Sequence, residues 1–449
     1  MRPRESNDRL RMLISETGWT YERTARAVAA VAAETGIRVR CDRSAVAHWL
    51  AGTRPRPAAA ACLLEALSRG LGRRIGPGQA GLSVAGSGSG ELGESDPLGQ
   101  LSRLLDAAVG KTIPGLEVYS PAGVIVPGWS GRTGRRPVCP DAAHVPEAIS
   151  ALRFFADLDA ARGGGHARPV LMSYLAVELA DRSPRLGDAL VPLVVLAGFT
   201  CFDEHQHALA QRLYQVAAAL AVQAGDLDGY VIAARGLAGQ AHALGHHDVA
   251  LWLIGDVLAL DERTAARFAG LHAYAACAYA AIGEFGAALS SLRDTGVALD
   301  AAARLAPPPF GGYDHAGLAK ATGLVLAAQR DLPAAVGALR VSLRCRPARS
   351  RRTRTLTMAR LADYELRRGR LRTAVDTWRQ VAESSQRLRS ARVQTAIGDA
   401  SARLLPHRRD PAVRSLLASI RDGQAVLRTS RANDLSAVAT ANHTARSLT

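Results

Sequence analysis

Lysine is nearly missing from this 449-residue chain: only Lys111 and Lys320 occur, so 54 of the 56 basic residues are arginines. Acidic residues are also in deficit, at 40, and the formal net charge is +16. A preference for arginine fits a GC-rich coding sequence as well, so it is weak evidence for phosphate recognition by itself. The sign of the charge is the stronger signal, and it predicts an anionic partner.

Paired cysteines and long apolar runs are missing too. The six cysteines lie far apart with no C-x-x-C spacing, which argues against a disulfide framework and a structural zinc site. The longest charge-free apolar stretches, 189–202 and 268–283, are shorter than the roughly 18–20 residues that cross a bilayer. The first residues lack the apolar core of a secretory signal. We therefore expect a cytoplasmic, nucleoid-associated protein without a transmembrane segment.

The first 76 residues have the pattern of a compact helical module. Apolar residues recur at helical spacing in four segments separated by turn-forming residues: 9–16, 20–34, 43–51 and 57–71. This module carries 14 arginines against 7 acidic residues. The next residues, 77–97, are crowded with Gly, Ser and Pro, which predicts a flexible linker. We expect the linker and an irregular segment to occupy 77–146.

The last part of the module contains a short helix with well-marked borders. Within the segment 41–57, Asp42 is a good N-cap for a helix that ends at Gly52. Pro55 and Pro57 prevent this helix from continuing, and Pro57 suits the start of the next one.

One face of this short helix has the composition that entry into a major groove requires. Val46, Trp49 and Leu50 point into the core by their spacing, which leaves small, polar and basic side chains opposite. A recognition helix needs small residues for close approach, donors for base edges and nearby cations for phosphates. The predicted DNA-binding residues are Arg43, Ser44, Ala47, His48, Thr53, Arg54 and Arg56.

Together with the helix expected at Tyr21–Ala33, this segment resembles the phage-repressor and Cro-like helix-turn-helix family. In that family a recognition helix ending at glycine is followed by a basic, proline-containing turn. The connection from Glu34 to Asp42 is longer than the tight turn of the family. The resemblance implies that residues 1–76 form a helix-turn-helix domain that binds double-stranded DNA.

An Ala/Leu-rich helical pattern fills residues 147–425, and its breaks recur at a regular spacing. Successive anchors lie 40, 38, 47 and 39 residues apart, and each is followed five residues later by alanine. The anchors and their alanines are His205 with Ala210, Gly245 with Ala250, Gly283 with Ala288, Arg330 with Ala335, and Gly369 with Ala374.

These units resemble the tetratricopeptide repeat. In the best copy, 272–300, Tyr279, Gly283, Phe285 and Ala288 fill the family's tyrosine, glycine, aromatic and alanine positions. The implied fold class is all-α, with the N-terminal helix-turn-helix domain followed by a tetratricopeptide-like α-solenoid. We expect residues 426–449 to be a disordered tail.

The whole arrangement resembles a family of actinobacterial transcriptional regulators, which includes a negative regulator of sporulation and antibiotic production in streptomycetes. The segments that carry this resemblance are 163–169 (GGGHARP), 186–193 (LGDALVPL) and 210–226 (AQRLYQVAAALAVQAGD). It implies a repressor of development and secondary metabolism. The repeat domain would serve homodimerisation or the binding of a protein or signal peptide. A tetratricopeptide scaffold without operator binding is the alternative.

Two further clusters allow more than one interpretation. Residues 340–372 contain twelve arginines and only two acidic residues, Asp363 and Glu365. This block either contacts an anionic partner or is a solvated loop. Histidines 205, 207, 242, 246 and 247 fall at equivalent repeat turns, where capping of helix ends is the simpler interpretation than a metal site. No G-x-S-x-G, Walker or Rossmann motif occurs, so we expect no catalytic residues, no cofactor and no metal.

Overall fold

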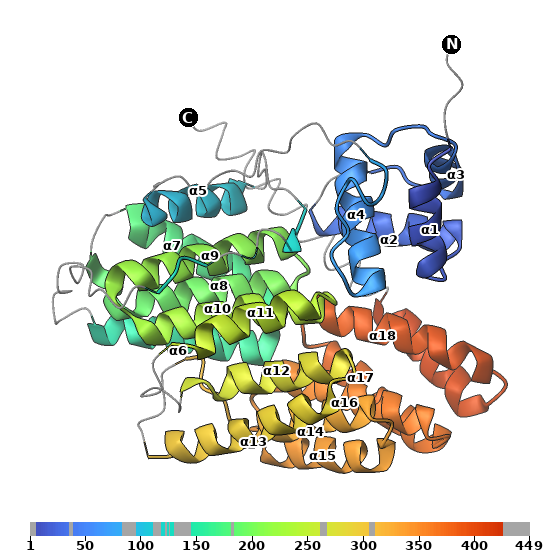
Figure 1. Ribbon diagram of the computed structural model, residues 1–449. Helices are drawn as coiled ribbons and strands as arrows, with labels where there is room; N and C mark the ends of the chain where they lie inside the picture. Colours follow the sequence, from blue (N-terminus) through green and yellow to red (C-terminus); the bar gives the residue numbers. More distant parts are fainter. Residues whose placement is uncertain are drawn as a thin grey trace, which may run out of the picture.

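The computed structural model describes residues 6–35, 39–82, 96–110, 118–121, 124, 126–129, 145–180, 184–260, 267–304 and 310–424. Every regular element within these ranges is helical, which confirms the predicted all-α class. The helices form a small N-terminal module beside a larger repetitive array (Figure 1).

The N-terminal module consists of four helices that share one apolar core. They are α1 (Asp8–Glu16), α2 (Tyr21–Glu34), α3 (Arg43–Leu50) and α4 (Pro57–Leu71), close to the four predicted segments. Side chains cap the first three: Asn7 accepts from the Leu10 amide, Thr20 from the Arg23 amide and Asp42 from the Ala45 amide.

The array consists mainly of antiparallel helix pairs. The first helices are α5 (Pro97–Gly110), α6 (Val145–Arg162), α7 (Gly164–Ala180) and the 3-10 segment η2 (Pro184–Ala189). Five pairs follow: α8 (Leu190–Asp203) with α9 (His207–Ala224), α10 (Leu227–Ala243) with α11 (His247–Leu258), α12 (Ala269–Ala281) with α13 (Phe285–Ala302), α14 (His315–Ala328) with α15 (Leu332–Cys345), and α16 (Arg351–Arg367) with α17 (Leu371–Ser385). Then come α18 (Ala391–Leu404), η4 (Leu405–His407) and a helix at 411–424.

The turns inside the five pairs have the same backbone conformation, as the repeat predicts. The anchor residue is left-handed in each, with φ of 60° at His205, 90° at Gly245, 88° at Gly283, 67° at Arg330 and 74° at Gly369. In every turn the backbone amide of the residue after the anchor donates a hydrogen bond to the carbonyl of the residue five positions before it, at 2.9–3.0 Å. His205 and Arg330 therefore hold a conformation that normally favours glycine.

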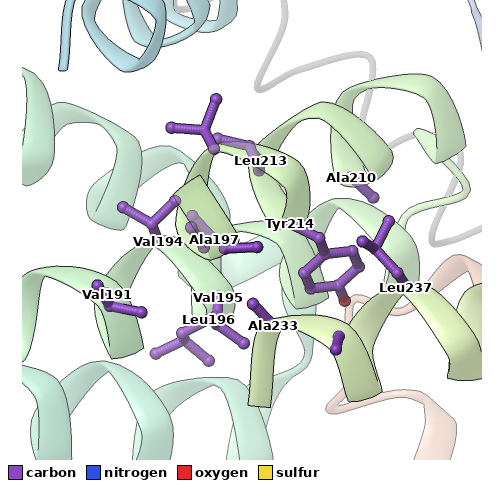
Figure 2. Packing of buried hydrophobic residues seen from close by; sticks show 14 of the residues in the cluster. Val191, Val194, Val195, Leu196, Ala197, Ala210, Leu213, Tyr214, Ala233 and Leu237 are labelled. Carbon is purple, nitrogen blue, oxygen red and sulfur yellow. The ribbon is translucent and has the colours of Figure 1, made fainter. Parts of the chain in front are cut away.

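The aligned alanines lie where the helices of the array approach most closely. Ala210, Ala250, Ala288, Ala335 and Ala374 are all fully buried, at 0% exposure. Glycine makes room in the same way around Tyr214, which packs among Ala197, Ala233 and Leu237 in Figure 2. A Cβ at Gly198 or Gly236 would lie 2.8 or 2.5 Å from the Tyr214 ring.

The C-terminal part of the array returns to its beginning. Helix α16 contacts α6, and the buried Arg352 forms ion pairs with Asp159 and Asp203. Next to them, the Ser390 hydroxyl donates to Asp203 Oδ1 at 2.8 Å, and the Gly165 amide donates to the Arg389 carbonyl at 2.9 Å. The start of α18 thus lies against the turns that follow α6 and α8.

Two of the expected domain boundaries differ from the structure. Residues 77–82 belong to the module, because Ala80 and Leu82 are buried in its core and the Asn7 amide group donates to the Ala80 carbonyl. Helix α5 falls inside the supposed irregular segment, and it contacts α7 and α9 through the buried Leu101 and Leu105. The Gly/Ser stretch at 83–95, most of 113–140 and the tail at 426–449 lie outside the described residues.

One described segment, Leu186–Asp203, is long and apolar enough to cross a membrane. Because 72% of it is buried inside the fold, its apolar side chains are accounted for as core of the array.

Replacement of Ala288 by leucine should destabilise the array. Ala288 is fully buried in a cluster with Ala276, Ala280 and Val325, so we expect Ala288→Leu to overpack it and to lower the free energy of unfolding by about 1–3 kcal/mol. The same change at Ala281, an exposed residue at the end of α12, should stay within about 0.5 kcal/mol. Urea unfolding followed by circular dichroism measures both, and equal effects would contradict the repeat register.

Candidate nucleic-acid interface

Helix α3 is built as predicted, with one face in the module core and the other in solvent. Val46, Trp49 and Leu50 are buried. On the opposite face, Arg43 and His48 are exposed, as are Ser44 and Ala47 between them. Figure 1 shows that α3 lies on the side of the module away from the array. The exposed face of α3 is therefore open to a large partner.

The turn after α3 presents two further cations. Gly52 has φ +90°, and the Thr53 amide donates to the His48 carbonyl at 2.9 Å, which ends the helix. Arg54 and Arg56 follow, both exposed, while Thr53 is half-buried. Within the described part of the chain, neither of these arginines nor Arg43 forms an ion pair.

Several other arginines of the module are used within the fold. Arg73, just after α4, pairs with Glu16 at 2.7 Å, and Arg9 donates to the Gly78 carbonyl at 2.9 Å. Arg23 lies over the Trp19 ring at 5.6 Å. Arg26, Arg40 and Arg74 are likewise exposed and form no ion pair within the described residues. What distinguishes α3 and its turn is that the unpaired arginines there flank a face of small and polar residues, where their guanidinium groups can meet phosphates.

A second polar centre lies on the other side of the module, where α2 and α4 meet the array. Arg69 of α4 donates to both Glu34 oxygens, at 2.7 and 2.9 Å, and to Glu65 Oε1 at 2.7 Å. His246, fully buried at the start of α11, lies with Nε2 3.0 Å from the same Glu65 oxygen. Burial has the largest effect on the pKa of the Glu34 carboxyl and raises it above its usual value, and the Arg69 guanidinium offsets part of this rise. We call this cluster the joint.

Residues 118–121 complete the joint. Val118 is part of the module core, whereas the next side chain, Tyr119, stacks on His246 at 5.6 Å and belongs to the array core. The Gln211 side chain of α9 then donates to the Ser120 carbonyl at 2.8 Å. This short segment, to which the sequence assigned no role, therefore connects the two cores.

Much of the arginine block 340–372 stabilises the array itself. Arg352 is the buried partner of Asp159, and Arg354 donates to the carbonyls of Leu343 and Arg346. Arg340 and Arg368 both donate to the buried Glu365, and Arg346 pairs with Asp314 at 3.4 Å. The interpretation of this block as a solvated loop is wrong for these residues.

The comparisons with known proteins concern the module. Residues 10–83 match the family model described as the SP15 N-terminal domain. The match begins in α1 and ends directly after Leu82, so it covers the four helices and the turn that packs on them. No curated protein matches the chain.

The sequence located the exposed face of α3 but missed the joint. All seven predicted DNA-binding residues lie together on α3 and the following turn. His205, His207 and His246 were expected to cap helices, yet neither α9 nor α11 has a side-chain cap. Their recurrence at the repeat turns was the available signal, but only the folded chain brings α2 and α4 against them.

Removal of Arg69 should destabilise the module strongly. It would leave the carboxylates of Glu34 and Glu65, which are 11% and 3% exposed, without their cation. We expect Arg69→Ala to cost about 3–5 kcal/mol of unfolding free energy. Arg73→Ala is the matched control, because its pair with Glu16 is about half exposed, and should cost about 0–1 kcal/mol. Similar losses in the two variants in urea unfolding would contradict a buried joint.

Proposed function

We propose that the chain is a sequence-specific, DNA-binding transcriptional regulator whose α3 enters the major groove. The observation that carries the proposal is the set of exposed, unpaired cations Arg43, Arg54 and Arg56 around a face of small and polar residues. Ala47 and Ser44 allow a close approach of the helix to base edges. Arg43 and His48 supply donors there, and Arg54 and Arg56 meet the phosphates.

The proposed output is repression of development and of antibiotic production in an actinobacterium. This part rests on the resemblance of residues 163–169, 186–193 and 210–226 to regulators of that family. The array would be the regulatory half, holding two chains as a homodimer or binding a protein or signal peptide. Dimerisation favours an operator with two half-sites, because the second module then binds at a high effective concentration.

Capture of genomic DNA fragments with the intact protein tests the function directly. A regulator should enrich a small set of fragments, and its affinity should fall with salt by a slope of about −0.9 for each phosphate neutralised. A tetratricopeptide scaffold without operator binding would enrich none.

Substitutions on α3 and on the turn should have different effects once an operator is known. We expect Arg43→Ala or His48→Ala to relax the preference for the operator by about 1–3 kcal/mol. Arg54→Ala or Arg56→Ala should weaken binding to all sequences alike and reduce the salt slope. Arg73→Ala removes a charge elsewhere on the module and is the control. Fluorescence anisotropy with operator and scrambled duplexes measures all five variants, and uniform losses of specificity would refute the division of roles.

Comparison of the intact chain with residues 1–82 tests the regulatory half. The fragment contains every residue of the module's apolar core except Val118. We expect the intact chain to bind the operator more tightly than the fragment at the same salt concentration, because a dimer presents two modules. Equal affinity and specificity, with no partner that alters the affinity of the intact chain, would show that the array has no regulatory role.

A further inference from the structure

Three potential metal ligands meet where the array touches α2 of the module. They are Glu34, at the end of α2, His205, in the turn between α8 and α9, and His207, the first residue of α9. One ligand atom from each lies within 4.8 Å of the other two. His207 Nε2 is 4.0 Å from Glu34 Oε1, and the two imidazole rings are 5.4 Å apart.

His207 lacks the partners that a buried imidazole needs. His207 is buried, with 4% of its surface exposed. Its Nδ1 has no hydrogen-bond partner. The 4.0 Å separation of Nε2 from Glu34 is too long for a hydrogen bond. Because most buried polar atoms have a hydrogen-bond partner, an imidazole without one at this position indicates room for a ligand.

The other two ligands are held in place by their surroundings. Arg69 donates to both Glu34 oxygens and fixes the carboxylate, and each oxygen keeps a further lone pair for a metal. The His205 Nε2 lies 3.5 Å from Thr395 Oγ1 of α18. Such outer contacts are typical of metal ligands.

Charges of both signs surround the three ligands. Glu34 and Glu65 share the guanidinium of Arg69. Arg392 is a second cation that acts on both histidines, and its guanidinium lies over the Phe202 ring.

We propose that Glu34, His205 and His207 bind a divalent transition-metal ion, Zn²⁺ by preference, across the boundary between the module and the array. Two imidazoles and one carboxylate form a common zinc ligand set that leaves a fourth position for water. Ligand atoms about 2.0–2.2 Å from zinc are closer together than those seen here, so the three side chains contract around the ion. This proposal differs from the sequence-based expectation of no metal.

Direct titration tests the site without reference to DNA. The intact chain, without a histidine tag and freed of metal by a chelator, is titrated with Zn²⁺ by calorimetry and with Co²⁺ by visible absorption. We expect one ion per chain and a Co²⁺ spectrum of low coordination number. Failure to bind one equivalent of Zn²⁺ would overturn the proposal.

Variants assign the ligands. His205→Ala, His207→Ala and Glu34→Gln should each weaken Zn²⁺ binding at least about tenfold. Since Glu34→Gln also loosens the contact with Arg69, His205→Ala at its half-buried turn position is the decisive variant. His315→Ala removes an exposed histidine at the start of α14 and should leave the affinity unchanged. Unchanged binding in His205→Ala, or loss in His242→Ala instead, would place any metal elsewhere.

The effect of the ion on DNA affinity rests on the proposed function, and it is measured separately. If Zn²⁺ fixes α2 against the array, operator affinity should differ between metal-loaded and metal-free protein, and His205→Ala should abolish that difference. A chain that binds Zn²⁺ but no DNA would refute the regulator and keep the site. A chain that binds DNA but no Zn²⁺ would refute the metal site and keep the regulator.

Discussion

The close approach of helices at small side chains is the constraint on which the array depends. Each pair buries an alanine at its crossing, and glycines at 198 and 236 admit the Tyr214 ring. Larger residues at these points would separate the helices and open voids along their whole length. The turn geometry, the ion pairs between α16 and the first helices, and the joint all require that spacing.

The repeat and α3 could be predicted from the sequence because both depend on local rules. A left-handed turn residue followed by a buried alanine has a fixed spacing, and the borders of α3 follow from Asp42, Gly52 and Pro57. Helix α5 and the joint were missed for a different reason. Leu101 and Leu105 look like any apolar pair, and Glu65 and His246 are 181 residues apart, so only the folded chain defines their partners.

Arginines occur in two kinds of environment in this chain. Arg69 and Arg352 are buried and meet carboxylates from distant segments, so they hold parts of the fold together. Arg43, Arg54 and Arg56 are exposed and form no ion pair within the described residues. The net charge alone hides this difference, since buried arginines contribute to it without being available to a partner.

The contact between the two ends of the array changes how its stability is distributed. In an open solenoid each repeat touches only its neighbours, so the terminal repeats fray first and the array can be lengthened or shortened by whole units. Here Arg352, Arg389 and Ser390 tie α16 and α18 to the turns after α6 and α8. Opening the last helices would expose the buried Asp159 and Asp203 at the beginning. The first and last helices therefore form one cooperative unit, and hydrogen exchange should be slowed together at both ends.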